Sequence, residues 1–304
     1  MQYESRPVHP TETISEGWEL IKNDYWLFFG MTLVMMLIVI AVSSVLGGVV
    51  GLIAQAVARG VGAAAGNVAG TAAALLPQII EQVFSIFTNL AAGVLSAMFM
   101  CGIYIALSRK ASGGAADFGD LFAGFRYFLP CLLVALIYTV IQFFVGITTI
   151  LIAFAFGISS FGAEILAPGG RIEPQIFQRL IPVFLVIGLF YLIFLLIFAV
   201  LTSFVYQLIA VRNFSAMEAI MQSVRAGLKN FFGLVGLFII QFFIALGGAL
   251  LCGVGILFVL PILVAANFAD YLRVFGRTTD LGAQHSPPPP PIFGNEADSR
   301  FSQF

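Results

Sequence analysis

Charged residues are scarce in this chain and make up only 10% of its 304 residues. Soluble domains carry about 25% charged residues, and without them a water-facing surface cannot be built. The composition therefore excludes a soluble catalytic domain. Hydrophobic residues make up 60% of the chain instead, and the mean hydropathy is +1.03, which predicts an integral membrane protein.

Metal ligands and reactive thiols are also few. The two histidines, His9 and His285, lie in the tails without Cys, Asp or Glu neighbours at the spacing of a metal site, so we expect no metal and no cofactor. The three cysteines, Cys101, Cys131 and Cys252, show no CxxC spacing. Their odd number excludes a full disulfide framework. We expect them to be small buried hydrophobic residues.

Long apolar stretches, by contrast, dominate the chain. Six of them reach the ~20 residues that a helix needs to cross a bilayer. The sequence therefore predicts an all-α integral membrane protein whose six transmembrane helices form three hairpins, each preceded by a cytoplasmic amphipathic helix. The predicted spans are 25–53, 77–107, 125–156, 176–210, 231–251 and 253–275.

The predicted membrane domain, 25–276, has a segment on either side. Residues 1–24 form an N-terminal segment that contains the first amphipathic helix. Within the domain, the Ala- and Gly-rich stretch 54–76 fits either a weak helix or a flexible external cap. The tail 277–304 contains a run of prolines and is predicted to be disordered.

The distribution of Lys and Arg predicts the orientation of the chain. Eleven of the fourteen basic residues would lie on the side of the two termini, and only Arg59, Arg171 and Arg179 on the other side. Cytoplasmic loops carry the excess of basic residues in membrane proteins. Both termini are therefore predicted to be cytoplasmic.

A repeated pattern links the three hairpins. Arg109 aligns with Arg212 and Gly124 with Gly227 at one constant offset. The first third of the chain matches more weakly, through Gly17. These matches predict a threefold internal repeat.

Each repeat begins with a candidate interfacial helix. Ser215 and Glu218 have the spacing of a capping box, and Thr13 and Glu16 repeat that spacing. Asp117 is expected to cap the second helix. The apolar faces would lie in the cytoplasmic headgroup layer, where the helices act either as elbows that direct each hairpin or as a collar that binds lipid or a partner. Elbows are favoured, because the polar faces carry mixed charge rather than a basic cluster.

Polar residues inside the spans form the candidate functional site. Glu81 and Asp270 are ionisable, and such groups in lipid often mark function, although both lie where they can reach an interface or a partner. Gln142, Gln207 and Gln241 could line a polar pathway, but amides also hold membrane helices together by hydrogen bonds. We favour the structural interpretation for both sets. No two catalytic residue types occur together within a span, so no catalytic residue is predicted.

One part of the chain resembles a known group of proteins. The capped segment from Ser215, the turn Cys252-Gly253-Val254-Gly255, Pro261 and the closing stretch 269–276 are similar to uncharacterised bacterial multi-pass membrane proteins. Those proteins are related to the membrane domain of glycerophosphoryl diester phosphodiesterases, and the resemblance spans most of 12–276. It implies a helical bundle in a bacterial inner membrane. The phosphodiesterase activity belongs to a separate soluble barrel that this sequence does not contain, so that activity is not implied.

These observations favour a non-enzymatic function. The expected role is to organise a membrane complex or the surrounding lipid. The expected partners are therefore membrane lipid and another membrane protein or a second copy of the chain, and not nucleic acid. The alternative is a transporter or channel for a small or lipid-like substrate, which requires Gln142, Gln241 and Asp270 to face one cavity.

Overall fold

The computed structural model describes residues 9–65, 70–155, 174–250 and 253–276. Within these ranges all regular secondary structure is helical. The predicted all-α class is confirmed for the described residues. Six helices are long and apolar enough to cross a membrane, which supports the predicted multi-pass membrane protein. The tail 277–304 and Cys252 lie outside the described residues.

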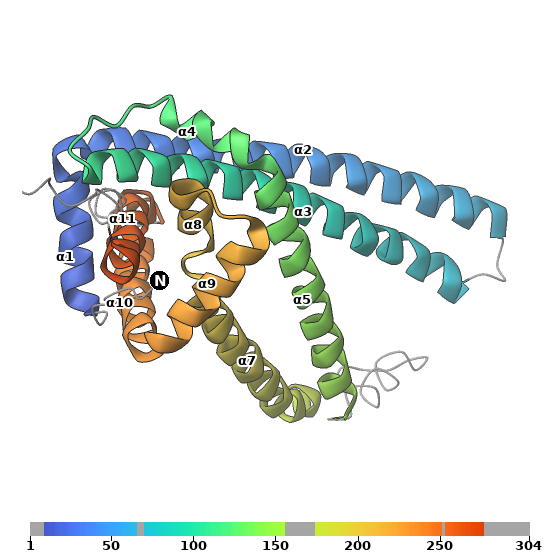
Figure 1. Cartoon of the computed structure of the whole chain (residues 1–304). Coiled ribbons are helices and arrows are strands. Elements are labelled where there is room, and N and C mark those ends of the chain that lie inside the picture. The colour runs from blue at the N-terminus through green and yellow to red at the C-terminus, as the bar shows by residue number, and fades with distance from the viewer. Residues whose placement is uncertain (1–8, 66–69, 156–173, 251–252, 277–304) are drawn as a thin grey trace, which may run out of the picture.

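The first pair of long helices is longer than predicted. Helix α2 (Tyr25–Ala65) and helix α3 (Gly70–Ala111) run side by side (Figure 1) and contain 41 and 42 residues. At 1.5 Å per residue each measures about 60 Å, roughly twice the ~30 Å of a bilayer core. The helices take up most of 54–76, because alanine has the highest helix propensity of all residues and offsets the glycines.

The second pair differs from the predicted spans in a different way. Helix α5 (Phe128–Ala155) and helix α7 (Pro174–Thr202) meet where the rings of Tyr138 and Phe198 pack edge to face, 4.9 Å apart. The predicted span 176–210 is interrupted: one candidate span covers Ile181–Arg212, but it is not a single helix. The helix ends at Thr202, and a separate helix, α8 (Val205–Arg212), follows after a short break.

The third pair is formed by α10 (Phe231–Leu250) and α11 (Gly255–Phe275), which pack against each other. Before α11 the chain turns at Gly253, whose positive φ of 73° is a conformation that glycine adopts without strain. Helix α9 (Ala216–Lys229) precedes this pair. Its start is the predicted capping box, with Ser215 and Glu218 bonded in both directions.

The first two amphipathic segments differ from their predictions. Helix α1 (Pro10–Ile21) begins before Thr13, so the predicted Thr13 cap is wrong: Thr13 lies inside the helix, and its hydroxyl donates to the carbonyl of His9. Proline at the first helical position, with its fixed φ, favours the earlier start. A 3₁₀ turn, η1 (Lys22–Asp24), then leads into α2.

The second amphipathic segment is shorter than expected. It consists of α4 (Asp120–Ala123) followed by the 3₁₀ turn η3 (Gly124–Tyr127). The carboxylate of Asp117 accepts a hydrogen bond from the amide of Gly119, just before the helix. The side chain of Asp117 therefore supports this turn, although the residue itself is not the N-cap.

Buried side chains gather at one end of the helix pairs. We call this region the base; it comprises α1, η1, α4, η3, α8 and α9 with the adjoining ends of the six long helices. These ends include Phe28 and Met31 of α2, 94–111 of α3, Cys131 and Val134 of α5, Val200 of α7, Leu234 of α10 and 264–275 of α11. From the base the three pairs extend in different directions (Figure 1). Away from it the helices carry exposed large apolar side chains, including Val49, Leu52, Phe87, Phe144, Leu151, Leu189, Leu192, Phe243 and Leu250.

Candidate functional site

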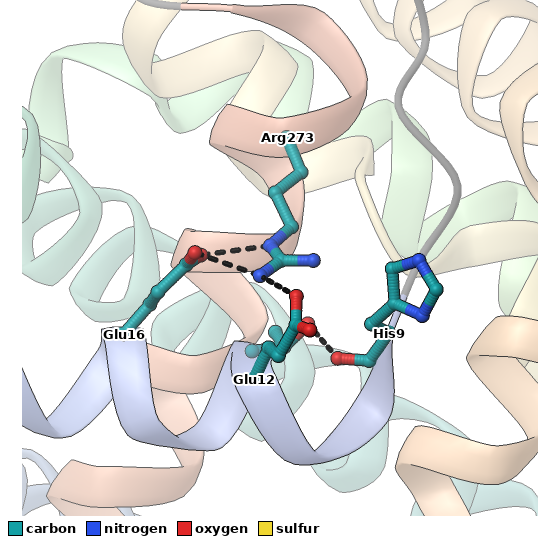
Figure 2. Close-up of polar contacts among 5 residues, drawn as sticks. His9, Glu12, Glu16 and Arg273 are labelled. Atoms are coloured by element: carbon teal, nitrogen blue, oxygen red, sulfur yellow. Dashed lines mark hydrogen bonds and ion pairs between the residues drawn. The ribbon is translucent and has the colours of Figure 1, made fainter.

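Helix α1 is held against α11 by one arginine. The Arg273 guanidinium donates to both carboxylate oxygens of Glu16, at 2.7 and 2.8 Å, and to Glu12 at 2.8 Å (Figure 2). The two glutamates lie one turn apart on α1, so a single guanidinium fork reaches both. The side chain of Arg273 is only 13% exposed. Glu16, predicted to complete a helix cap, instead binds this arginine.

Helix α1 follows α11 in the antiparallel direction along most of its length. Gly17 lies against the backbone of Ala265 and Ala266. Further on, the Tyr25 hydroxyl donates to the Phe258 carbonyl at 2.7 Å. The N-terminal segment is therefore packed on the last helix of the chain, and this contact joins the two ends of the described structure.

Two basic residues at the end of α3 bind carboxylates of other elements. Arg109 pairs with Asp120 of α4 at 2.7 Å, and the Asp120 side chain is 5% exposed. Lys110 pairs with Asp24 of η1. The amphipathic segment α4 is thus held by an arginine near the end of a long helix, as α1 is held by Arg273.

Three glycines allow the short elements α1, η3 and α9 to approach their neighbours closely. A Cβ on Gly17 would lie 2.5 Å from the Ala266 amide nitrogen. One on Gly124 would lie 1.8 Å from the Met98 carbonyl oxygen, and one on Gly227 would lie 2.6 Å from the Val200 carbonyl oxygen. Non-bonded atoms do not approach so closely, so each contact requires glycine.

A buried polar residue stands four positions before each of these glycines. Thr13, Asp120 and Ser223 are all buried. Ser223 supplies hydrogen-bond partners to backbone groups at the break between α7 and α8. Its hydroxyl accepts from the Phe204 amide at 3.1 Å and donates to the Leu201 carbonyl at 2.8 Å. Backbone groups freed by a helix break need such partners. The side chain of Ser223 therefore stabilises the break between the two helices.

Two further networks tie the elements of the base together. The Tyr127 hydroxyl in η3 is 3.0 Å from the Ala210 carbonyl and 2.6 Å from the Asn213 side-chain oxygen, beyond the end of α8. Arg212, at the end of α8, donates to the Tyr271 hydroxyl at 3.0 Å and to the Phe275 carbonyl. Neither network was expected from the sequence, because each joins residues far apart along the chain.

Among the described residues, the predicted polar side chains Gln142 and Gln241 lie in different surroundings. Gln241 is buried and donates to Asn267 of α11 at 2.9 Å, which fits the predicted role of holding helices together. Gln142, which matches Gln241 in the repeat, is exposed on α5. The side chain of Glu81 lies outside what the structure describes.

Asp270 and Gln207 differ from these residues. Each is 1% exposed, and their side-chain oxygen and nitrogen atoms have no hydrogen-bond partner among the described residues. Arg273, one turn away, is engaged by Glu12 and Glu16 and does not pair with Asp270. An unpaired buried carboxylate is costly, which makes Asp270 the residue best suited to hold a proton or a cation.

The structure also brings two cysteines together. The sulfur atoms of Cys101 on α3 and Cys131 on α5 are 3.8 Å apart, and both residues are free thiols without exposed surface. Their burial agrees with the expected role as small hydrophobic residues, although their contact was not foreseen. Among the described residues, no three His, Cys, Asp or Glu side chains lie together as metal ligands would.

Comparisons with known proteins do not assign this chain to a family. No family model, no curated protein and no solved structure matches the chain. The resemblance to the membrane domain of glycerophosphoryl diester phosphodiesterases therefore stays a prediction.

Proposed function

We propose that this chain is a non-enzymatic membrane protein that organises the lipid, and with it the proteins, around three diverging helix pairs. The proposal rests on the distribution of buried residues along the chain. The base is tightly packed, whereas the most apolar stretch of α2 has no buried residue. Such surfaces are stable only when lipid or another apolar surface covers them.

The surfaces of α5 and α7 support the same function. The two helices pack on each other where the rings of Tyr138 and Phe198 meet. Large apolar side chains are exposed on both helices, among them Phe143 and Phe144 on α5 and Leu192 on α7. Acyl chains or another apolar protein surface are expected to cover them.

The proposed architecture is a threefold repeat of an amphipathic segment followed by a helix pair. The matched positions of Gly17, Gly124 and Gly227 support it, because each lies against the second long helix of another pair. We further infer that the base lies at the cytoplasmic side of a bacterial inner membrane, since most of the basic residues lie in or beside it.

Native mass spectrometry of the protein, extracted with its surrounding membrane in polymer-bounded discs, tests the function. A reproducible set of retained lipids or a stoichiometric protein partner is expected. The same protein after delipidation in detergent is the control and should lose the lipid set. Retention of one small molecule, with no preferred lipid or partner, would contradict the proposal.

A second candidate is transport of a proton or a cation, which the burial of Asp270 and Gln207 without partners favours. If it is correct, replacing Asp270 with Asn abolishes flux into vesicles and leaves the lipid set unchanged. Wild-type protein without any flux would exclude it.

A further inference from the structure

The side chains of α9 divide into three faces. One face is buried, a second carries exposed apolar side chains, and the third carries exposed charged side chains. At 3.6 residues per turn these groups occupy separate sectors of the helix. The buried face contains Ala216, Ala219, Ser223, Ala226 and Gly227; the apolar face contains Met217, Met221 and Leu228; and the charged face contains Glu218, Arg225 and Lys229.

Two cations on the charged face have no acidic partner among the residues that the structure describes. Arg225 and Lys229 lie one turn apart, and within the described residues neither has an ion pair or a hydrogen bond through its side chain. The other basic residues of the base do have partners. Four of them bind carboxylates, namely Lys22, Arg109, Lys110 and Arg273. The other two, Arg126 and Arg212, donate to uncharged oxygens.

The acidic residue on the same face is already committed. The Glu218 carboxylate accepts hydrogen bonds from the hydroxyl and the amide of Ser215, at 2.8 and 3.1 Å. The side-chain hydrogen bond from Ser215, with the backbone hydrogen bond, lowers the pKa of Glu218. Its charge therefore serves the helix cap and leaves Arg225 and Lys229 free to bind an anion.

Only the third amphipathic segment carries this pair. In the alignment of Gly17, Gly124 and Gly227, the positions of Arg225 and Lys229 correspond to Ser15 and Glu19 of α1 and to Phe122 and Arg126 of the second segment. Arg126 itself donates to Tyr127 and lies over its ring. The anion-binding feature is thus confined to α9.

We propose that Arg225 and Lys229 bind the headgroup phosphate of an anionic phospholipid in the cytoplasmic leaflet, with its acyl chains along Met217, Met221 and Leu228. The inference rests on the membrane orientation of the proposed function. The adjoining apolar face favours a lipid over a soluble anion, because the headgroup of one lipid can bind the charged face while its acyl chains cover the apolar face. A guanidinium with a neighbouring ammonium matches a phosphate, and long basic side chains reach the headgroups from a helix in the interface.

Native mass spectrometry with added lipid tests the proposal. Purified full-length protein is titrated with phosphatidylglycerol and with phosphatidylethanolamine of the same acyl chains. Wild-type protein should bind the first lipid several-fold more tightly. The double variant Arg225→Gln, Lys229→Gln should lose roughly 25-fold in affinity for phosphatidylglycerol, about fivefold for each basic residue, and bind phosphatidylethanolamine as before.

Three controls make the result specific. Lys22→Gln removes one positive charge from a residue paired with Glu19 and should keep the preference. Arg225→Lys keeps the positive charge and should retain most of the affinity. This result would show that the lost charge, and not misfolding, weakens binding in the double variant. Millimolar inorganic phosphate should not compete, since it lacks acyl chains.

An unchanged preference in the double variant, or no preference in wild-type protein, would overturn the proposal. Loss of a protein partner in place of the lipid would also overturn it. In each of these cases wild-type protein would still retain the lipid set or partner that tests the proposed function, so the two failures can be told apart.

Discussion

At the scale of single residues, glycine and serine determine how the base is packed. The backbones of η3 and α3 touch at Gly124 and Gly102, where a Cβ would lie 1.8 Å from the Met98 oxygen and 2.1 Å from the Leu121 oxygen. Ser223 supplies both a donor and an acceptor to the break after α7. These small residues carry no charge, yet the contacts between elements depend on them.

Gly124→Ala should destabilise the protein by at least about 2 kcal/mol, because the added methyl group forces the backbones apart. Thermal unfolding in detergent, followed by circular dichroism, measures the change. Gly146→Ala is the matched control, since nothing lies within 4 Å of a Cβ there, and it should be neutral or slightly stabilising. Equal melting temperatures for both variants would contradict the close contact.

Ser223→Ala should cost about 1–3 kcal/mol, because the Phe204 amide and the Leu201 carbonyl lose a buried partner. Ser112→Ala, which removes an exposed hydroxyl bonded within its own helix end, should change stability by less than about 0.5 kcal/mol. The same unfolding measurement compares them. A neutral Ser223→Ala variant would mean that the break does not need this side chain.

At the scale of secondary-structure elements, the amphipathic segments are packed parts of the base. Helix α1 follows α11 and is held by Arg273 at one end and by the Tyr25 contact at the other. All three acidic side chains of α1 are engaged with basic residues: Glu12 and Glu16 with Arg273 of α11, and Glu19 with Lys22 of η1. Asp24 of η1 pairs in turn with Lys110 of α3. Although the sequence of α1 is net acidic, its carboxylates are therefore paired with basic residues of the protein.

The double variant Glu12→Gln, Glu16→Gln should loosen α1. Arg273 keeps its charge but loses both carboxylates, so the ion pairs that hold α1 on α11 are removed. Hydrogen exchange of peptides covering 10–21 should become faster, while exchange in α5 stays unchanged. Glu19→Gln is the control. Unchanged exchange in the double variant would mean that packing at Gly17 alone holds the helix.

At the scale of the whole molecule, contacts within the base join helix pairs that diverge elsewhere. The contact of Cys101 with Cys131 lies between α3 and α5, and Arg212 connects α8 to α11. Burial decreases with distance from this base. The base is therefore the part of the protein expected to keep one shape, while the surrounding lipid sets the spacing of the pairs.

Mild copper-phenanthroline oxidation should join Cys101 to Cys131 by a disulfide. Trypsin cleavage after Arg109 or Lys110 separates the two residues in sequence, so the fragments should stay linked on a non-reducing gel and separate after reduction. Cys131→Ser should abolish the link, and Cys252→Ser should not. Fragments that separate without reduction would contradict the packing of α3 on α5.

Much of the fold and little of the site follow from the sequence alone. Long apolar stretches must be helical in lipid, because every backbone group has to be bonded within the segment, so the class and the six long helices were predictable. The Ser215 and Glu218 cap was predictable because it is local. The partners of Arg273, the isolation of Asp270 and the Cys101 contact were decided only by tertiary packing, because each depends on residues distant in sequence, which local pattern and composition do not encode.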